Sequence, residues 1–188
     1  MVEKIALQGF SRLKFFPVTG NNTEEYAVDA DKAFLVPWVQ DMTRENDTSE
    51  AKIFADDTLY LNVKNWNGIR STITVAELTL EMMGMLGFGD YDETARSLEW
   101  NPQGRNLEFG VTFRCLQTNG NYRMMRMYSF KIDEVRETAI RTRGDNVAIN
   151  AYQLIGTFAN RVIDGRPGDI HDGDDMDWLE DIPAAARV

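Results

Sequence analysis

The chain has 188 residues, enough for one domain with a sizeable core, and its hydrophobic fraction of 43% argues against global disorder. One cysteine and one histidine exclude an internal disulfide and a zinc site built from several Cys and His ligands. The formal net charge of −10 disfavours tight DNA binding, because affinity for phosphates depends largely on Lys and Arg. The N-terminus lacks the long apolar stretch of a signal peptide, so we expect a cytosol-like compartment.

The N-terminal third predicts extended structure. GFSRLKFFPVT is expected to form the first strand, and a long loop is expected over residues 20–33. AKIFADDTLYLNV (residues 51–63) is apolar on both sides of Asp56 and Asp57, which predicts an extended hairpin. Adjacent acids on a strand point to opposite faces, so these two side chains are poorly placed to act on one substrate atom.

A hairpin turn and a helix are predicted next. Asn67-Gly68 is a strong hairpin signal between two β-rich runs. The spacing of Thr74 and Glu77 is that of a capping box, which predicts a helix over residues 76–86. The expected apolar face and closing glycine of this helix are Leu78, Met82, Met85 and Gly87.

The second half of the chain predicts three further strands. Residues 105–115 alternate apolar and polar side chains, as in a half-buried strand, and a turn signal at Asn119-Gly120-Asn121 joins them to residues 122–132. Arg126 interrupts the apolar face of this second strand, which indicates a bulge, a snorkelling stem or a contact with an acid of a neighbouring subunit. Residues 146–162 form another β-branched and apolar run.

Charge is distributed unevenly along the chain. Residues 164–188 hold eight acids and two bases, whereas residues 105–143 hold eight bases and four acids. Opposite charge on separate segments suits copies that meet one another. Within the acidic segment, Trp178 and Leu179 form a short apolar stretch that suits contact with a partner.

These patterns predict a mainly β fold: a β-sandwich with one flanking α-helix, a long protruding hairpin and an extended C-terminal arm. We expect one domain over residues 1–163, with loop or hairpin regions at 20–33 and 41–58, followed by an acidic arm at 164–188.

The acidic arm invites comparison with a calcium-binding loop. With Asp169 at position one, Glu180 falls at position twelve, but Gly173 and Asp174 then occupy positions five and six and the required glycine is misplaced. A solvated or partner-binding arm is therefore the favoured interpretation, and no metal site is expected.

Other short motifs give little support for catalysis. Arg143-Gly144-Asp145 spells a cell-adhesion tripeptide, but its position between two predicted strands favours an ordinary turn. The chain contains no phosphate-binding loop, GxSxG elbow or HExxH motif, so no catalytic residue and no cofactor is expected. A carboxylate-based, metal-dependent hydrolase that uses Asp56, Asp57 and the arm is a remote alternative.

The order of several segments resembles a known family. AKIFADDTLYLNV is followed by the helix AELTLEMMGML, the GFG that closes it, EFGVTFRCL, YRMMRMYSFKI and RTRGDNVAINAYQLIGTF. This succession resembles the major tail tube proteins of long-tailed, non-contractile bacteriophages, and the resemblance covers about Ser49 to Phe158.

The resemblance implies a virion protein, assembled in the cytoplasm of the bacterial host, that forms hexameric rings stacked into a tube. Its partners would be copies of itself, the tape measure protein in the lumen, and terminator and distal tail proteins at the ends, with DNA passing through without tight binding and no membrane involved. A tail terminator or tail-completion ring protein is the alternative. We expect subunit contacts at Ile53, Phe54, Asp56, Asp57, Tyr60, Arg126, Trp178 and Leu179.

Overall fold

The computed structural model describes residues 6–55, 58–101, 107–137 and 151–186. The strands are β1 (Leu7–Asn21), β2 (Glu25–Val28), β3 (Phe34–Val36), β4 (Val39–Ala55), β5 (Thr58–Val75), β6 (Gly89–Asp92), β7 (Ser97–Trp100), β8 (Glu108–Gln117), β9 (Tyr122–Glu137), β10 (Tyr152–Ala159), β11 (Gly168–Asp172) and β12 (Ala185–Ala186). The helices are α1 (Leu80–Met85) and the short 3-10 helix η1 (Met176–Leu179).

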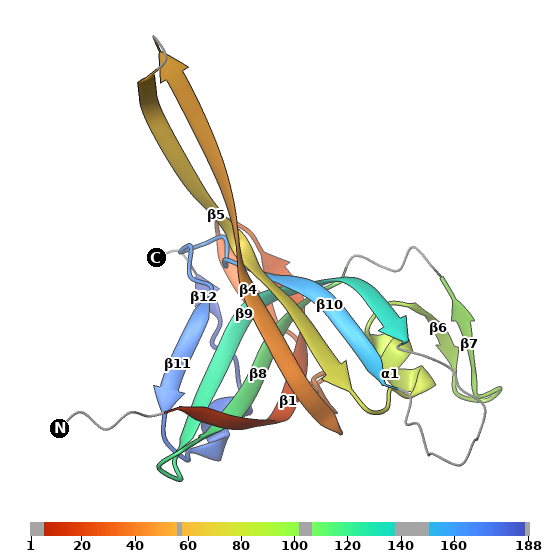
Figure 1. The fold of residues 1–188 in the computed structure, drawn as a ribbon. Helices are drawn as coiled ribbons and strands as arrows, with labels where there is room; N and C mark the ends of the chain where they lie inside the picture. The colour runs from red at the N-terminus through yellow and green to blue at the C-terminus, as the bar shows by residue number, and fades with distance from the viewer. Residues whose placement is uncertain (1–5, 56–57, 102–106, 138–150, 187–188) are drawn as a thin grey trace, which may run out of the picture.

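Antiparallel strands dominate the structure, which confirms the prediction of a mainly β fold. In the described residues, ten strands form one sheet in the order β12-β2-β1-β8-β9-β10-β5-β4, with β11 beside β9 and β3 beside β1. Figure 1 shows that this sheet is strongly twisted, and that α1 and the separate β6–β7 pair lie together at one end. Five of the ten described strand pairs join strands that are consecutive in the chain, namely β1–β2, β4–β5, β6–β7, β8–β9 and β9–β10.

The sheet buries apolar side chains on both of its faces. A large cluster includes Phe15, Ile73, Phe109, Phe113, Phe130 and Phe158, and a smaller one consists of Phe16, Tyr26, Tyr128 and Ile182. Strand β8 contributes Phe109 and Phe113 to the large cluster, while Thr112, on its opposite face, is also fully buried. The prediction of a half-buried strand is therefore wrong for β8, because the C-terminal residues cover its second face.

The helix is shorter than predicted. Helix α1 begins at Leu80, and the side chain of Thr79 caps it by accepting a hydrogen bond from the Met82 amide at 3.2 Å. Thr74 cannot cap a helix because it lies within β5 and pairs with Gln153 of β10. The predicted closing glycine is confirmed, since Gly87 has a φ of +86° directly after the helix.

The hairpin predicted at Asn67-Gly68 is wrong, because β5 runs without a turn through both residues. Gly68 pairs with Asp47 of β4, and its neighbour Ile69 pairs with Phe158 of β10. A Cβ atom on Gly68 would lie 2.6 Å from the carbonyl oxygen of Phe158, and the φ of Gly68 is +148°. Glycine is thus required here for close approach between strands and not for a tight turn.

The loop predicted over residues 20–33 is interrupted by a strand. Strand β2 folds back on β1, with Val18 paired to Val28 and Asn21 paired to Tyr26. The side chain of Asn22 accepts hydrogen bonds from the backbone of Glu24 and Glu25 and closes the turn. The predicted first strand and the β8–β9 hairpin are confirmed.

Candidate assembly surfaces

The most prominent surface feature is the β4–β5 hairpin, which extends far from the rest of the domain (Figure 1). Its strands contain 17 and 18 residues. From Ile69 onward β5 also pairs with β10, but the hairpin beyond Gly68 pairs only with itself in the described sheet. The described side chains of residues 48–52 and 62–67 are exposed, so these stretches of the hairpin contribute no buried core.

The outer hairpin contains the predicted contact segment. Ile53 pairs with Leu61 and Phe54 pairs with Leu59, so the register shifts at Tyr60. Asp56 and Asp57 lie outside the described residues. The extended hairpin predicted for this segment is therefore confirmed at the level of the backbone, and its role as a contact remains a prediction.

Polar contacts between the two strands support the outer hairpin. Asn62 of β5 donates a hydrogen bond to Glu50 of β4 at 2.6 Å, and Lys52, also of β4, lies 3.4 Å from the same carboxylate. At the root, Ser71 donates to the Thr43 carbonyl at 2.9 Å. These contacts are mostly solvent-exposed and contribute little stability to the domain.

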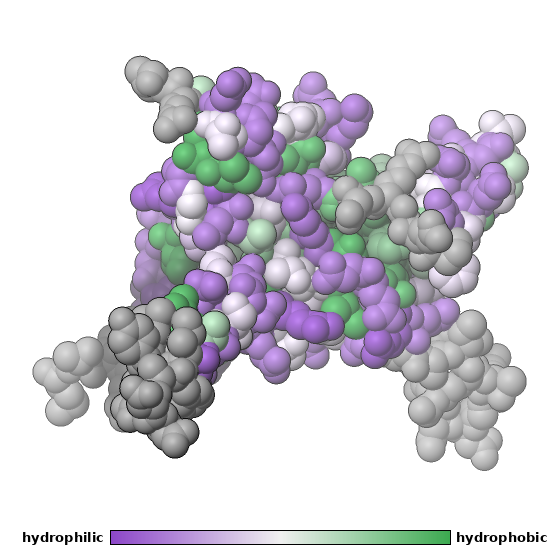
Figure 2. Space-filling model, turned by 90° about the horizontal axis from the view of Figure 1, so that it is seen from above, coloured by the Kyte–Doolittle hydropathy of each residue, from purple (hydrophilic) through white to green (hydrophobic). Residues whose placement is uncertain are grey.

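Large exposed apolar side chains mark further contact candidates. Trp38 is 69% exposed and Trp100 is 72% exposed. Trp38 also has a φ of +58°, a conformation that is uncommon for a bulky residue. Figure 2 shows apolar side chains among the hydrophilic ones on the face seen from above. Exposed tryptophans are typical anchors of protein interfaces.

The C-terminal residues do not form a free arm, so the prediction of an extended arm is wrong. Strand β11 pairs with residues 123–127 of β9, and β12 pairs with β2. Leu179 and Ile182 are each 2% exposed and fill the space above β8 and β9. We call residues 168–186 the C-terminal strap, because they cross the outer face of the sheet and return to its edge.

The irregular position of Arg126 is explained by a bulge in β9. Phe109 pairs with Phe130 but Val111 pairs with Met127, so β9 contains one extra residue at this point. Arg126 therefore lies on the face that the strap covers. Its Nε donates to the Trp178 carbonyl at 2.8 Å, and its guanidinium lies 4.1 Å from the centre of the Trp178 ring.

Three of the predicted subunit contacts are consequently occupied within the chain. Burial lowers the pKa of Arg126, and its guanidinium contacts Trp178 of its own chain. Leu179 is buried, and its carbonyl accepts a hydrogen bond from Thr112 at 2.8 Å. In the isolated chain, Arg126, Trp178 and Leu179 hold the strap.

The acids of the strap meet bases of the sheet. Asp172 accepts two hydrogen bonds from Arg123, at 2.6 and 2.7 Å, and these lower the pKa of the carboxyl group. Glu180 forms an ion pair with Lys14 at 2.6 Å. The opposite charges of the two sequence segments therefore form contacts within one chain, and the charge counts alone do not indicate this.

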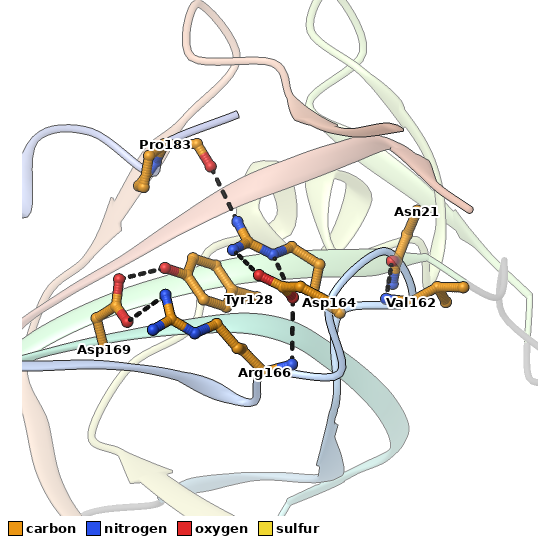
Figure 3. Close-up of polar contacts among 8 residues, drawn as sticks. Asn21, Tyr128, Val162, Asp164, Arg166, Asp169 and Pro183 are labelled. Atoms are coloured by element: carbon orange, nitrogen blue, oxygen red, sulfur yellow. Dashed lines mark hydrogen bonds and ion pairs between the residues drawn. The ribbon is translucent and has the colours of Figure 1, made fainter. Parts of the chain in front are cut away.

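A buried arginine fixes the connection between β10 and the strap. Arg161 is 4% exposed and donates to Asp164 at 3.1 and 2.5 Å, and its guanidinium lies 3.9 Å from the centre of the Tyr128 ring. Burial alone would lower the pKa of Arg161, but its hydrogen bonds to Asp164 raise it. Figure 3 shows Asp164, Tyr128 and Pro183 around this position.

The network continues into the first residues of the strap. The Tyr128 hydroxyl donates to Asp169, and burial and this contact raise the pKa of Tyr128 to about 12. Arg166 lies 3.9 Å from the other oxygen of Asp169 (Figure 3). No sequence motif signals this arrangement, because its members come together only when β11 pairs with β9.

The segment that resembles a calcium loop has other contacts. Asp169 and Asp172 bind Tyr128 and Arg123, and the His171 ring stacks on Trp178. Among the described residues, no group of three His, Cys, Asp or Glu side chains is placed to hold a metal ion.

No protein-family model matches the chain, and no curated protein matches it at a significant level. Over the part of the chain that the structure describes, no helix has the length and apolar character needed to cross a membrane.

Proposed function

We propose that the chain is a structural subunit of a bacteriophage tail tube, with a β-sandwich tail-tube fold, that assembles with its own copies into stacked hexameric rings and has no catalytic role. The observation that carries this proposal is the outer β4–β5 hairpin, which leaves the domain and has exposed side chains. The order of sequence segments from about Ser49 to Phe158 supports the same assignment.

The energetics of the outer hairpin favour a partner. An isolated two-stranded hairpin is at best marginally stable in water. Ordering its backbone costs about 1–2 kcal/mol per residue, and the exposed side chains of residues 48–52 and 62–67 bury little surface to offset that cost. A second subunit that covers the hairpin would supply the missing burial.

The sheet edge also favours assembly. Strand β4 is the last strand of the described sheet, and no described strand pairs with its outer edge, so that edge can receive another strand. Its exposed acids are Asp41, Glu45, Asp47 and Glu50. Charged side chains on an edge oppose uncontrolled aggregation of free subunits.

A contact between different surfaces of successive copies produces an open filament when it does not close into a ring.

The proposal includes the partners and the setting of a tail tube. The tape measure protein would fill the lumen, terminator and distal tail proteins would bind the ends, and the tube would belong to the virion after assembly in the bacterial cytoplasm. The net charge of −10 suits a conduit through which DNA passes without sticking, because like charges repel. No cofactor is needed for this role.

Negative-stain microscopy and light scattering of purified protein over a range of concentrations would test the proposal. Tubes or stacked rings are the expected result, and preformed tubes added as seeds would shorten the lag before growth. A protein that stays monomeric at every concentration, with and without seeds, would contradict the proposal. Single rings that never elongate would instead identify a terminator or tail-completion protein.

A further inference from the structure

We propose that the sheet face beneath the C-terminal strap is an intersubunit docking surface, and that its partner is the acidic strap of a second copy. In the assembled state, each strap would leave its own domain and occupy the same site on a neighbour. This inference rests on the proposed self-assembly and names a second contact in addition to the β4–β5 hairpin.

The docking face is cationic and complementary to the strap. Its bases come from three strands: Lys14 of β1, Arg114 of β8 and Arg126 of β9. Arg123 points to the other face of β9, since it pairs with Cys115, and it meets the strap where β11 runs beside β9. The strap contains seven acids and neither Lys nor Arg. Three contacts between the sheet and the strap are Lys14 with Glu180, Arg126 with the Trp178 carbonyl, and, beside β11, Arg123 with Asp172. Such a pattern gives both orientation and specificity to a docked segment.

The contacts of the strap are of a kind that another copy can reproduce. Strand β11 pairs with β9, β12 pairs with β2, and the Leu179 carbonyl accepts from Thr112 of β8. All three partner strands precede the strap in the chain and belong to the sheet. An identical face on a neighbour offers the same hydrogen bonds and ion pairs, which is the physical basis of domain swapping.

The strap is held mainly by polar contacts and a small apolar area. Within it, Leu179 and Ile182 are the buried apolar side chains, whereas Ile170 is 68% exposed. The Arg123–Asp172 and Lys14–Glu180 pairs are partly exposed to solvent, so salt weakens them. Detaching this element therefore costs less than removing a strand from the centre of the sheet.

The connector between β10 and β11 can lengthen if its turn opens. In the monomer, the Arg161 amide donates to the Arg166 carbonyl at 2.8 Å, and the Gly165 amide donates to the Arg161 carbonyl at 2.9 Å. The Arg161–Asp164 pair locks this compact turn. Residues 160–167 span roughly 26 Å when extended, at about 3.3 Å per residue, so opening the turn would let β11 lie much farther from the end of β10.

A disulfide trap distinguishes a strap in its own domain from one on a neighbour. Arg123 and Asp172 are directly paired on adjacent antiparallel strands, so their Cα atoms are expected at about 4.5–5.5 Å, within the range for a disulfide. The test protein carries Arg123→Cys and Asp172→Cys in a Cys115→Ala background, because Cys115 is the other direct neighbour of Arg123. The single variants Arg123→Cys and Asp172→Cys in that background are the controls.

The protein with the two introduced cysteines is oxidised before or after assembly, and its chains are then separated on a non-reducing denaturing gel. Free protein is expected to run as an internally linked monomer, and assembled protein as a ladder of linked chains. A second pair, Met124→Cys with His171→Cys, uses the next register position and keeps the Arg123–Asp172 ion pair.

Microscopy of the same samples separates the two proposals. Tubes that contain only internally linked monomers would overturn strap exchange and leave the tail-tube proposal intact. Absence of tubes and rings would contradict the tail-tube proposal. The gel of concentrated protein would still test strap exchange. Linked dimers would support the exchange, and internally linked monomers alone would overturn it.

Discussion

The guanidinium of Arg126 stacks on the ring of Trp178 at 4.1 Å while its Nε donates to the carbonyl of the same residue. The two residues are far apart in sequence, and their contact joins β9 to η1. Arg126 is the one charged residue on the predicted apolar side of this strand, and the contact attaches the C-terminal strap to β9. Both groups are partly buried, so the contact is stronger than an exposed pair would be.

Replacing Arg126 with Ala is expected to lower the free energy of unfolding by about 1–3 kcal/mol, from the lost cation–π contact and the unpaired Trp178 carbonyl. Urea denaturation monitored by tryptophan fluorescence measures the change. The matched control is Arg136→Ala, since Arg136 pairs with Glu134 in solvent and is expected to contribute under about 0.5 kcal/mol. Equal effects of the two substitutions would contradict the assigned role of Arg126.

The apolar part of the strap is tested by two isoleucines of opposite burial. Ile182 is 2% exposed and packs on Phe16, Tyr26 and Tyr128, so Ile182→Ala is expected to cost about 2–4 kcal/mol of stability. Ile170 is 68% exposed, and Ile170→Ala is expected to change stability by less than about 0.5 kcal/mol. Chemical denaturation of both variants measures the difference. A strap that does not pack on its own domain would give small effects for both.

The packing of strands where the β4–β5 hairpin leaves the domain depends on Gly68. Gly68→Ala places a Cβ against the Phe158 carbonyl, whereas Gly120 has a φ of +85° with no atom within 4 Å of its Cβ position. Gly120→Ala therefore measures backbone strain alone, and Gly68→Ala is expected to cost about 1–3 kcal/mol more, because backbone must shift to relieve the clash. Thermal unfolding of the two variants gives the comparison. A similar midpoint for both would show that the strands at Gly68 separate freely.

Acid is expected to weaken the strap connection through Asp164. Hydrogen bonds from Arg161 lower the folded-state pKa of this carboxyl below its ordinary value of 3.8. A lowered folded pKa stabilises the protein above pH 3.8, and this contribution is lost as the pH falls from there through the folded pKa. Asp164→Asn is therefore expected to be less stable at pH 7 and to lose less stability between pH 5 and pH 3 than the wild type.

Urea denaturation at several pH values between 3 and 7 checks the expected change in slope. The control is Asp31→Asn, which alters an exposed carboxylate outside this network. If Asp164→Asn and the wild type lose stability in parallel, the Arg161–Asp164 pair does not contribute to the pH dependence.

The sequence predicted those strands whose pattern is local. Alternation around Phe109 and the turn signal at Gly120 identified the β8–β9 hairpin, and the apolar segments around Asp56 and Asp57 identified the β4–β5 hairpin. The Asn67-Gly68 signal failed because Gly68 pairs with Asp47 of β4 and the next residue, Ile69, pairs with both β4 and β10. This pairing outweighs the local preference for a turn. The same close packing explains why glycine occupies the position.

The strap could not be predicted from the same patterns. The acidic and basic segments are visible in the sequence, but charge alone does not say whether Asp172 meets an arginine of its own chain or of another. The extra residue in β9 moves Arg126 to the covered face, and a bulge of this kind leaves no clear sequence signal. Arg161 was missed because its burial depends on Tyr26 and Tyr128, which are distant in sequence.

The outer hairpin is expected to be required for assembly and dispensable for folding. Replacing residues 48–67 with a two-residue turn removes the exposed side chains of residues 48–52 and 62–67 and keeps Asp47, Gly68 and the pairing of β5 with β10. The thermal midpoint is therefore expected to change by only a few degrees, whereas tubes should be absent by negative-stain microscopy.

Mixing this variant with the wild type tests whether the hairpin is needed for each further addition to a tube. A chain that lacks the hairpin but keeps the surface that receives it can join the end of a growing tube without supporting the next addition. Substoichiometric amounts of the variant are therefore expected to shorten wild-type tubes in proportion to the amount added. Tubes of normal length formed by the variant alone would show that the hairpin is not an assembly contact, because its removal would then have left every necessary interface in place.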